Sequence, residues 1–328
     1  MYQAYPSSVE EGLTLFADFR VPAEPRPLLV TTHGWHGQIK KAHADNVDTG
    51  APDQDWFVIY VEMRGRGDSG GKPDCNGWEL QDVVDAVEFA KRRYAEHIRD
   101  PHLVTLTGGS GGGSNVMGLL GKFPDYFCRA KAECGISDFA LWYRNDQVGE
   151  FRDEMDVWMG TTPDRDPEAY ASRGGLTLAG NLCTPLIIFH GDQDRRVPVE
   201  QARRYVDALR RTGKGELVSY FELKGVGHPG HYGGATPAQD EFRLTAGAAF
   251  LADQPVPVSI PEKGYLVVGG YLKTHDFEVV LESVNRVAEI HYNLNTDSFV
   301  LHALKPCKAR LRVRQPDDGW AERELTSC

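Results

Sequence analysis

The sequence lacks the features of several classes of protein. Its six cysteines include no Cys-x-x-Cys pair, which argues against a structural zinc site. No apolar run approaches the length of a membrane-spanning helix. The N-terminus has no basic start followed by an apolar core, so we expect no signal peptide and a cytoplasmic protein. A chain from which a leader had been removed would look the same.

The sequence also has fewer basic than acidic residues. The chain has 36 Lys and Arg residues against 47 Asp and Glu residues, which gives a net charge of −11. This balance disfavours nucleic acid and anionic membrane surfaces as partners. The hydrophobic fraction of 41% is ordinary for a globular protein, and 328 residues suffice for one large domain and a small one.

The most informative motif is the run Gly108-Gly109-Ser110-Gly111-Gly112, which fits the nucleophile-elbow pattern Gly-x-Ser-x-Gly. Residues 102–107 before it predict a buried strand, and residues 114–122 after it predict a helix. In such a sharp strand-to-helix turn the glycines provide space, and the serine hydroxyl stays exposed. Because the chain contains 35 glycines, the pattern also arises by chance and needs support from elsewhere.

A nucleophilic serine needs a base, and the base needs a carboxylate that orients it. Two further predicted strands, at 185–189 and 217–223, are followed by an acid and by a histidine in that order. The candidate acids are Asp194 and Asp192, and the candidate bases are His228 and His231. Loops at the carboxyl ends of parallel strands can converge on one site.

Upstream, a predicted strand at 27–32 ends in His33-Gly34-Trp35. Taken together, residues 28–254 resemble an α/β-hydrolase, most closely the catalytic domain of the prolyl oligopeptidase family, with features of acetyl xylan esterases. The matching segments are Arg64 to Gly71, Gly108 to Gly112, Ile136 to Asp138, His190 to Pro198 and Gly227-His228.

The resemblance implies a role for individual residues. Ser110 matches the nucleophile, Asp194 the acid and His228 the base, while Asp192 and His231 are the rivals. The main-chain N–H groups of Trp35 and Gly111 match the oxyanion donors. Some members of the family add a tyrosine hydroxyl to the oxyanion hole, and Trp35 has none. From their charges, and apart from the resemblance, Arg64 and Asp68 are expected to hold the Arg-Gly loop below the site by ion pairing.

The alternation of strands and helices predicts a mostly parallel sheet covered by helices on both faces. We predict a catalytic domain at 1–254, which contains an early antiparallel strand near 12–20 and is closed by a helix that begins at Thr236-Pro237. Its long aromatic segment 138–182 is either a cap, with Trp142 and Tyr143 contacting substrate, or a helical hairpin that buries its own aromatic residues.

After Pro257 the pattern changes to short β-rich runs, which predict a small all-β domain at 258–328. A unit this small is marginally stable alone, so we expect it to dock on the catalytic domain. It is a binding module for carbohydrate or a partner, or a structural or dimerising cap. Cys307 and Cys328 could form a disulfide bridge within it.

The sequence therefore predicts a serine hydrolase that cleaves a carboxylic ester through an acyl-serine intermediate, without metal or other cofactor. The expected substrate is a small ester or a short peptide, and a homo-oligomer is possible. One alternative is a peptidase like prolyl oligopeptidases, whose N-terminal β-propeller has no counterpart in this sequence. The other alternative is a binding module that has kept the hydrolase fold without catalysis.

Overall fold

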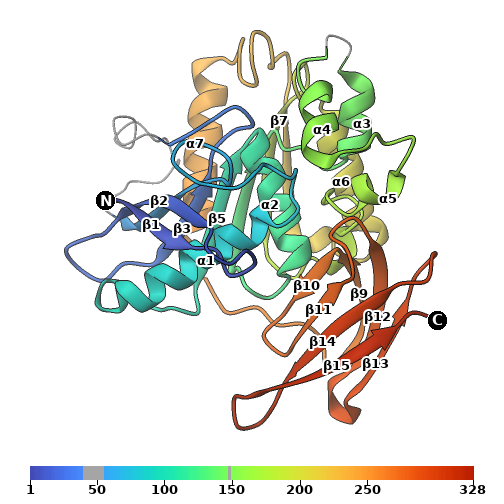
Figure 1. The fold of residues 1–328 in the computed structure, drawn as a ribbon. Helices are drawn as coiled ribbons and strands as arrows, with labels where there is room; N and C mark the ends of the chain where they lie inside the picture. Colours follow the sequence, from blue (N-terminus) through green and yellow to red (C-terminus); the bar gives the residue numbers. More distant parts are fainter. Residues whose placement is uncertain (40–54, 147–148, 254) are drawn as a thin grey trace.

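A computed structural model describes residues 1–39, 55–146, 149–253 and 255–328 (Figure 1). Residues 147–148 of the predicted cap, and residue 254 at the predicted domain end, lie outside the described residues. The described residues form one sheet of eight strands and one of seven strands. The first sheet lies within residues 1–254 and the second within residues 258–328. That these two ranges are separate domains remains a proposal.

The eight-stranded sheet has the order β1-β2-β4-β3-β5-β6-β7-β8. The pairs β1–β2 and β2–β4 are antiparallel, and every other pair is parallel. The strands are β1 (Tyr2–Pro6), β2 (Thr14–Arg20), β3 (Leu28–Thr32), β4 (Phe57–Glu62), β5 (Val104–Gly109), β6 (Arg129–Glu133), β7 (Leu186–Gly191) and β8 (Val218–Leu223). This confirms the predicted α/β-hydrolase fold, although β1 was not predicted.

Helices cover both faces of this sheet. They are α1 (Glu79–Arg93), α2 (Gly111–Lys122), α6 (Glu200–Arg211) and α7 (Pro237–Ala252), with short 3₁₀ turns η3 (Ala95–His97), η4 (Ala179–Asn181) and η5 (Gly215–Leu217). Alternate residues of a strand face opposite sides. Leu28 and Val30 accordingly join the main core with residues of α1 and α2, whereas Leu29 packs with Leu251 of α7. The strand β3 is therefore buried on both faces, which explains its continuous apolar sequence.

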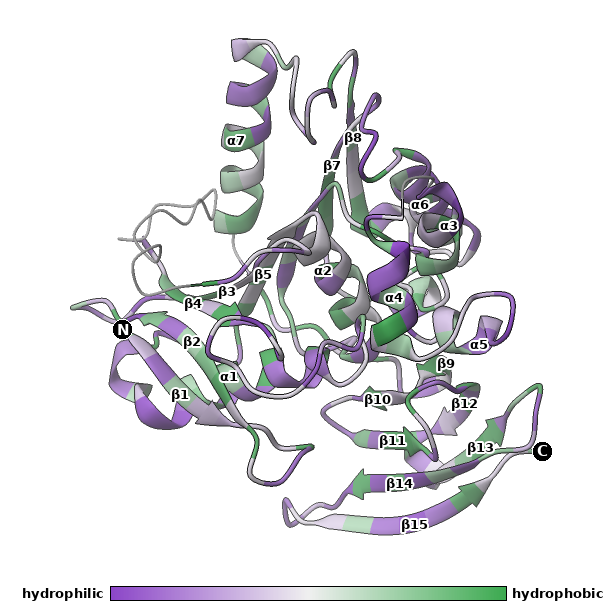
Figure 2. Cartoon of the chain, turned by 45° about the horizontal axis from the view of Figure 1, so that its top comes forward, coloured by the Kyte–Doolittle hydropathy of each residue, from purple (hydrophilic) through white to green (hydrophobic). Residues whose placement is uncertain are grey.

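The start of α7 confirms the predicted cap at Thr236. The Thr236 side chain accepts the N–H of Gln239, and the Gln239 side chain accepts the N–H of Thr236. This reciprocal capping satisfies two donors that a helix start otherwise leaves open. The rest of α7 shows hydrophobic and hydrophilic stripes in Figure 2, as expected for a helix that covers one face of a sheet.

Three short helices lie between β6 and β7, within the predicted cap segment (Figure 1). They are α3 (Phe139–Asn145), α4 (Arg152–Met159) and α5 (Pro167–Ala171). Their apolar side chains form most of a small core, to which Trp35, in the loop after β3, adds a partly buried side chain. The segment is thus both a self-packed helical unit and a neighbour of the loop after β3.

The second sheet is antiparallel, with the order β13-β12-β9-β10-β11-β14-β15. Its elements are β9 (Lys263–Gly269), β10 (Tyr271–Lys273), β11 (Phe277–Leu281), β12 (Val287–Asn293), η6 (Leu294–Thr296), β13 (Ser298–His302), β14 (Lys308–Arg314) and β15 (Trp320–Thr326). The N–H of Cys328 donates to Leu301 at the opposite end of the strand order, so the sheet curls. Cys307 and Cys328 are both free thiols, and the suggested bridge between them is wrong.

Buried polar contacts join the second sheet to the first. The Asn181 amide donates to the carbonyl of Val267 at 2.7 Å and accepts the N–H of Val267 at 2.8 Å. At the end of α2, the Lys122 ammonium donates to the carbonyls of Ser172 and Gly269. Because these groups are buried, they need the partners that β9 provides.

None of the helices among the described residues combines the length and the hydropathy that a membrane crossing requires.

Candidate active site

Ser110 occupies a strained turn between β5 and α2, as the motif predicts. Its φ of 57° and ψ of −120° lie outside the regions that non-glycine residues favour. A Cβ atom on Gly108 would lie only 2.4 Å from the oxygen of Gly112, and one on Gly112 would lie 2.6 Å from that of Thr32. These two positions therefore require glycine. The Ser110 N–H donates to Glu133 at 2.8 Å, which fixes the turn against β6.

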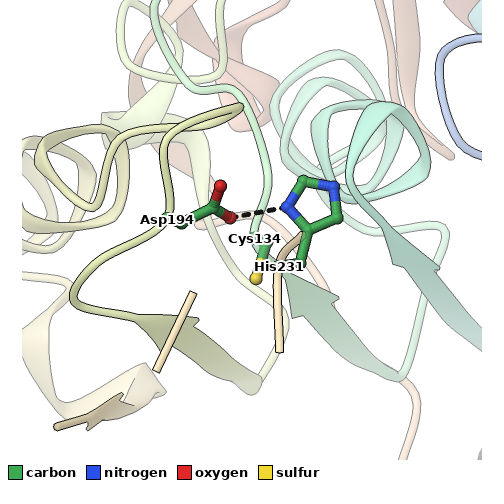
Figure 3. A group of neighbouring side chains, drawn as sticks. All are labelled: Cys134, Asp194 and His231. Carbon is green, nitrogen blue, oxygen red and sulfur yellow. Dashed lines mark hydrogen bonds and ion pairs between the residues drawn. The ribbon is translucent and has the colours of Figure 1, made fainter. Parts of the chain in front are cut away.

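Asp194 lies on the loop after β7, with its carboxylate buried. One oxygen, Oδ1, accepts the main-chain N–H groups of Arg196 at 2.9 Å and Val197 at 3.0 Å. The other oxygen, Oδ2, lies 2.5 Å from Nδ1 of His231 (Figure 3). Burial alone would raise the pKa of Asp194, but the hydrogen bond and the charge of His231 lower it below its ordinary value.

The rival acid lies at the outer side of the same loop. Asp192 accepts the N–H of Gly225 at 2.7 Å, and its other oxygen is 3.7 Å from the ammonium of Lys224. It therefore closes the junction with the β8 loop instead of orienting a histidine. Of the two candidate acids, the structure brings Asp194 to a histidine.

The structure corrects the choice of histidine: Asp194 contacts His231 and not His228. The His231 side chain is 24% exposed, so its ring is mostly packed but still accessible to solvent. His228 is exposed, and only its main-chain N–H is bound, to the oxygen of Gly233 at 3.1 Å. We therefore replace His228 by His231 in the candidate triad.

The loop after β8 explains this exchange. Gly227, at φ 134°, presses its backbone against Asp194; a Cβ there would lie 2.1 Å from the Asp194 nitrogen. Its N–H and that of His228 both donate to Gly233, which closes the loop on itself. With the loop closed in this way, the His228 side chain is exposed to solvent, and the His231 side chain contacts Asp194. The sequence offered both histidines, and the signal that decides between them is a contact within the folded loop.

A buried histidine supports the acid loop from below. His190 in β7 has Nε2 at 2.7 Å from the carbonyl of Val197 and at 3.8 Å from Oδ2 of Asp194. Burial lowers the pKa of His190. The imidazole is therefore neutral, and its Nε2–H donates to Val197, which holds the turn that presents Asp194.

The loop after β3 places the two predicted oxyanion donors together. A Cβ on Gly111 would lie 2.4 Å from the main-chain nitrogen of Trp35, so the two backbones are in close contact. Within the described residues, neither the Trp35 N–H nor the Gly111 N–H donates to an acceptor. Two free N–H groups beside a serine are the arrangement that an oxyanion requires.

His33 holds this loop in place. Its Nδ1 lies 2.8 Å from the carbonyl of Gly34, and its Nε2 accepts the N–H of Met63 at 3.1 Å. Burial lowers the pKa of His33 to about 4, so the ring is neutral and carries its proton on Nδ1. One imidazole thus links the oxyanion loop to the end of β4.

Aromatic residues of the cap surround the Trp35 side chain. Its ring centroid is 4.8 Å from that of Trp142, 5.0 Å from that of Trp158 and 6.0 Å from that of Phe139. Trp142, predicted to contact substrate, is buried behind Trp35 and donates to the carbonyl of Arg196 at 2.7 Å. Trp158 remains partly exposed beside Trp35 and was not singled out from the sequence.

Tyr143, the other residue predicted to contact substrate, packs within the cap. Its ring lies 5.8 Å from that of Tyr170, and its hydroxyl donates to Asp156 at 3.3 Å. The sequence could not distinguish neighbouring aromatic residues of a short helix that point in different directions.

The rim of the site carries two carboxylates that are already paired. Glu154 accepts the indole N–H of Trp35 at 2.5 Å and lies 2.9 Å from Nε2 of His36. Glu150 pairs with the guanidinium of Arg196 at 2.6 Å. Both rim carboxylates are therefore occupied by hydrogen-bond donors and by a positive charge of the same chain.

Arg64 holds the loop after β4 by an ion pair, as predicted, but the partner is Asp82 and not Asp68. Arg64 is buried and binds Asp82 of α1 through two nitrogens, at 2.5 and 2.8 Å, while Asp68 is exposed. Burial raises the pKa of Asp82 to about 6 despite this partner. The pair anchors the loop after β4 to α1.

One group of side chains near the site could hold a metal ion. Donor atoms of Cys134, Asp194 and His231 all lie within 4.8 Å of one another (Figure 3).

Comparison with models of protein families shows the family of the chain. The model of the prolyl oligopeptidase family matches residues 49–254, which is more than half of the chain. The chain belongs to the prolyl oligopeptidase family. Membership places it among the serine hydrolases, the enzyme class predicted from its sequence.

Similar proteins include both peptidases and esterases. The uncharacterized peptidase YuxL of Bacillus subtilis is 32% identical over 53% of this chain and 27% of its own length. Esterase LipC of Mycobacterium tuberculosis is 25% identical over 63% of this chain and 54% of its own length. The chain thus spans between about a quarter and half of these relatives.

Solved structures show the same fold. The acylaminoacyl peptidase of Pyrococcus horikoshii has a TM-score of 0.62 at 21% identity, over 77% of this chain and 42% of that chain. An esterase of Pyrococcus furiosus has a TM-score of 0.54 at 15% identity, over 75% of this chain and 89% of that chain.

Proposed function

We propose that this protein hydrolyses carboxylic esters through an acyl intermediate on Ser110, with His231 as the base and Asp194 as the acid. The observation that carries the proposal is the hydrogen bond between Asp194 and His231. Both residues lie on loops at the carboxyl ends of parallel strands, in the sheet whose strand β5 leads into Ser110. This order of serine, acid and histidine is that of α/β-hydrolases.

The proposed reaction begins with Ser110. Its Oγ attacks the ester carbonyl while Nε2 of His231 accepts the hydroxyl proton. Asp194 accepts the Nδ1–H of His231, keeps the ring in the tautomer that leaves Nε2 free, and stabilises the imidazolium that forms. His231 then returns the proton to the leaving alcohol. A water molecule, activated in the same way, releases the acid from Ser110.

Negative charge develops on the carbonyl oxygen during both attacks. The N–H groups of Trp35 and Gly111 are the proposed donors to this oxyanion, since both are free within the described residues. His33 contributes by positioning the loop that carries Trp35.

The surroundings of the site favour a neutral acyl group. Aromatic rings, with Trp35 and Trp158 partly exposed, form the wall beside the oxyanion loop. The rim carboxylates Glu150 and Glu154 are engaged by donors of this chain and so are poor partners for a substrate ammonium. Two curated relatives in which similar segments occur are an esterase and a probable carboxylic ester hydrolase.

A second candidate is the release of acylated amino acids from peptides. The likeness to acylaminoacyl-releasing enzymes favours it, because an N-acylated substrate is also neutral at its end. It differs from the first candidate only in the leaving group, an amine instead of an alcohol.

The experiment compares matched substrates on the purified protein. We expect kcat/KM for short acyl nitrophenyl esters to exceed that for N-acetyl-aminoacyl and free aminoacyl nitroanilides by at least ~10²-fold, or about 2.7 kcal/mol in transition-state free energy. Comparable rates on the N-acetylated amide would instead establish the second candidate. Ser110→Ala is the control, and should lower turnover by about 10⁶-fold and abolish labelling by a fluorophosphonate. Absence of both turnover and labelling in the wild type would favour a non-catalytic binding protein.

A further inference from the structure

Cys134 is a buried residue that the proposed reaction does not use. It follows β6 with a φ of 47°, in the left-handed region that glycine adopts readily and other residues avoid. The residue before it, Glu133, accepts the main-chain N–H of Ser110. Cys134 therefore adjoins the nucleophile turn, and strained backbone at such a place points to a role beyond packing.

The Cys134 thiol lies beside the proposed acid and base. Its sulfur, a carboxylate oxygen of Asp194 and a ring nitrogen of His231 are all within 4.8 Å of one another (Figure 3). Thiolate sulfur, imidazole nitrogen and carboxylate oxygen are the three donors that zinc binds in proteins, at about 2.0–2.3 Å. Donor atoms this close together could share one ion.

Tyr232 provides an independent observation at the same place. Its hydroxyl oxygen is buried, and no described residue lies at the distance and angle of a normal hydrogen bond to it. The hydroxyl lies against the Cys134 thiol and interacts with it. Buried hydroxyl groups normally have a partner, and here the nearest candidate is the thiol itself, so Tyr232 adds a fourth polar group beside the cluster.

We propose that Cys134, Asp194 and His231 form a binding site for a thiophilic divalent cation of the Zn²⁺ type, and that the bound ion inhibits the enzyme. The site itself follows from the donors and their spacing. The inhibition rests on the proposed function, because it requires that Asp194 and His231 act with Ser110.

The binding step balances as a replacement of protons by metal. The Cys134 S–H bond breaks, its proton goes to solvent, and the sulfur bonds to the ion. The Nδ1 lone pair of His231 forms a second bond, and the proton of that nitrogen moves to Nε2. The third bond comes from the carboxylate of Asp194, which needs no deprotonation. An imidazole with its proton on Nε2 cannot accept the proton of Ser110, so the first step of hydrolysis stops.

Binding of Co²⁺ to the full-length protein tests the site without any substrate. A thiolate bound to Co²⁺ gives a sulfur-to-metal charge-transfer absorption, and Zn²⁺ then displaces it. Cys134→Gly suits the left-handed backbone and should fold; Cys134→Ala is the second variant. Cys128→Ala is the matched control, because Cys128 is also buried and its thiol bonds within the sheet to Val104.

We expect one ion per wild-type chain with the thiolate absorption, and the same for Cys128→Ala. Both Cys134 variants should bind at least about 100-fold more weakly, since even loss of a residue that only orients a ligand costs about 10–100-fold. In the esterase assay, Zn²⁺ should inhibit the wild type reversibly, with recovery on chelation. Cys134→Gly should keep its activity and lose the sensitivity to Zn²⁺.

Equal binding by the wild type and the Cys134 variants, or no thiolate absorption in the wild type, would overturn the site. Binding at Cys134 without loss of esterase activity would overturn the inhibitory role. If the ion binds as expected but the wild type hydrolyses no ester or amide, the metal site stands and the proposed function fails. The binding and activity measurements thus separate the two proposals.

Discussion

Nδ1 of His231 lies 2.5 Å from Oδ2 of Asp194, although 37 residues separate them in the sequence. The other oxygen of Asp194 is held by the main chain of its own turn, so Oδ2 is left for the histidine. One oxygen of Asp194 therefore stabilises its own loop, and the other holds the candidate base against that loop after β7.

His231→Ala should therefore lower kcat/KM for an ester by about 10⁴–10⁶-fold, because no other side chain replaces the proton acceptor of Ser110. His228→Ala should remain close to the wild type, since His228 is exposed and Asp194 contacts His231 instead. Circular dichroism checks that both variants fold. The opposite ranking of the two variants would restore His228 as the base.

Asp194→Asn should reduce kcat by about 10³–10⁴-fold, because an amide stabilises the wrong tautomer of His231 and no imidazolium charge. Asp192→Asn is the control and should cost far less, as Asp192 only joins two loops through Gly225. Steady-state kinetics on one ester measure both variants. A larger loss in Asp192→Asn would show that the acid is placed two residues too late.

The stability of the protein should depend on His33 in mild acid. Its pKa is about 4 in the folded protein, below its ordinary value of 6.5. The unfolded chain therefore takes up a proton that the folded chain excludes as pH falls between these values. The contribution of the neutral ring, about 3 kcal/mol in all, is complete above pH 6.5 and is lost progressively as the pH falls to 4.

His33→Gln removes this titration and keeps a donor and an acceptor near Gly34 and Met63. Urea unfolding at several pH values should show a smaller fall in stability between pH 6.5 and 4 in this variant than in the wild type. His97→Gln, at a partly exposed position in η3, should follow the wild type. Parallel curves for all three proteins would contradict a neutral, buried His33.

Asn181→Ala should weaken the attachment of the second sheet. The variant leaves the buried N–H and carbonyl of Val267 without their partners, at a cost of about 2–4 kcal/mol. The midpoint of urea unfolding measures this cost. Asn293→Ala, which removes a cap within the second sheet, should cost about 1 kcal/mol or less. Equal losses in the two variants would show that the Asn181 contacts stabilise little.

The sequence predicted most of what local chemistry determines. The elbow at Ser110 follows from glycines whose space is needed within a few residues, and the cap at Thr236 follows from a side chain three residues away. The choice of the base, in contrast, could not be made from local sequence. Both His228 and His231 follow β8, and the choice depends on how Gly233 closes the loop and how Gly227 meets Asp194.

Two strands of the second sheet, β10 and β15, leave little signal in the sequence. β10 has only three residues and follows a bend at Gly270, where φ is 74°. β15 is an exposed strand with charged residues on it, so hydrophobic alternation does not reveal it. Its pairing with β14 becomes visible only in the folded chain.

Lys122 ends the helix that begins beside Ser110, and one of its acceptors, Gly269, comes 147 residues later. A ribosome makes the residues of the hydrolase sheet first, when neither Lys122 nor Asn181 has its acceptor from β9. Both side chains also bind acceptors made earlier, Ser172 for Lys122 and Gly121 for Asn181, but their full set of partners exists only once β9 has emerged. A chain that ends before residue 263 would therefore lack the acceptors that β9 gives to Lys122 and Asn181, so the second sheet completes the hydrogen bonding of side chains that belong to the first part of the chain.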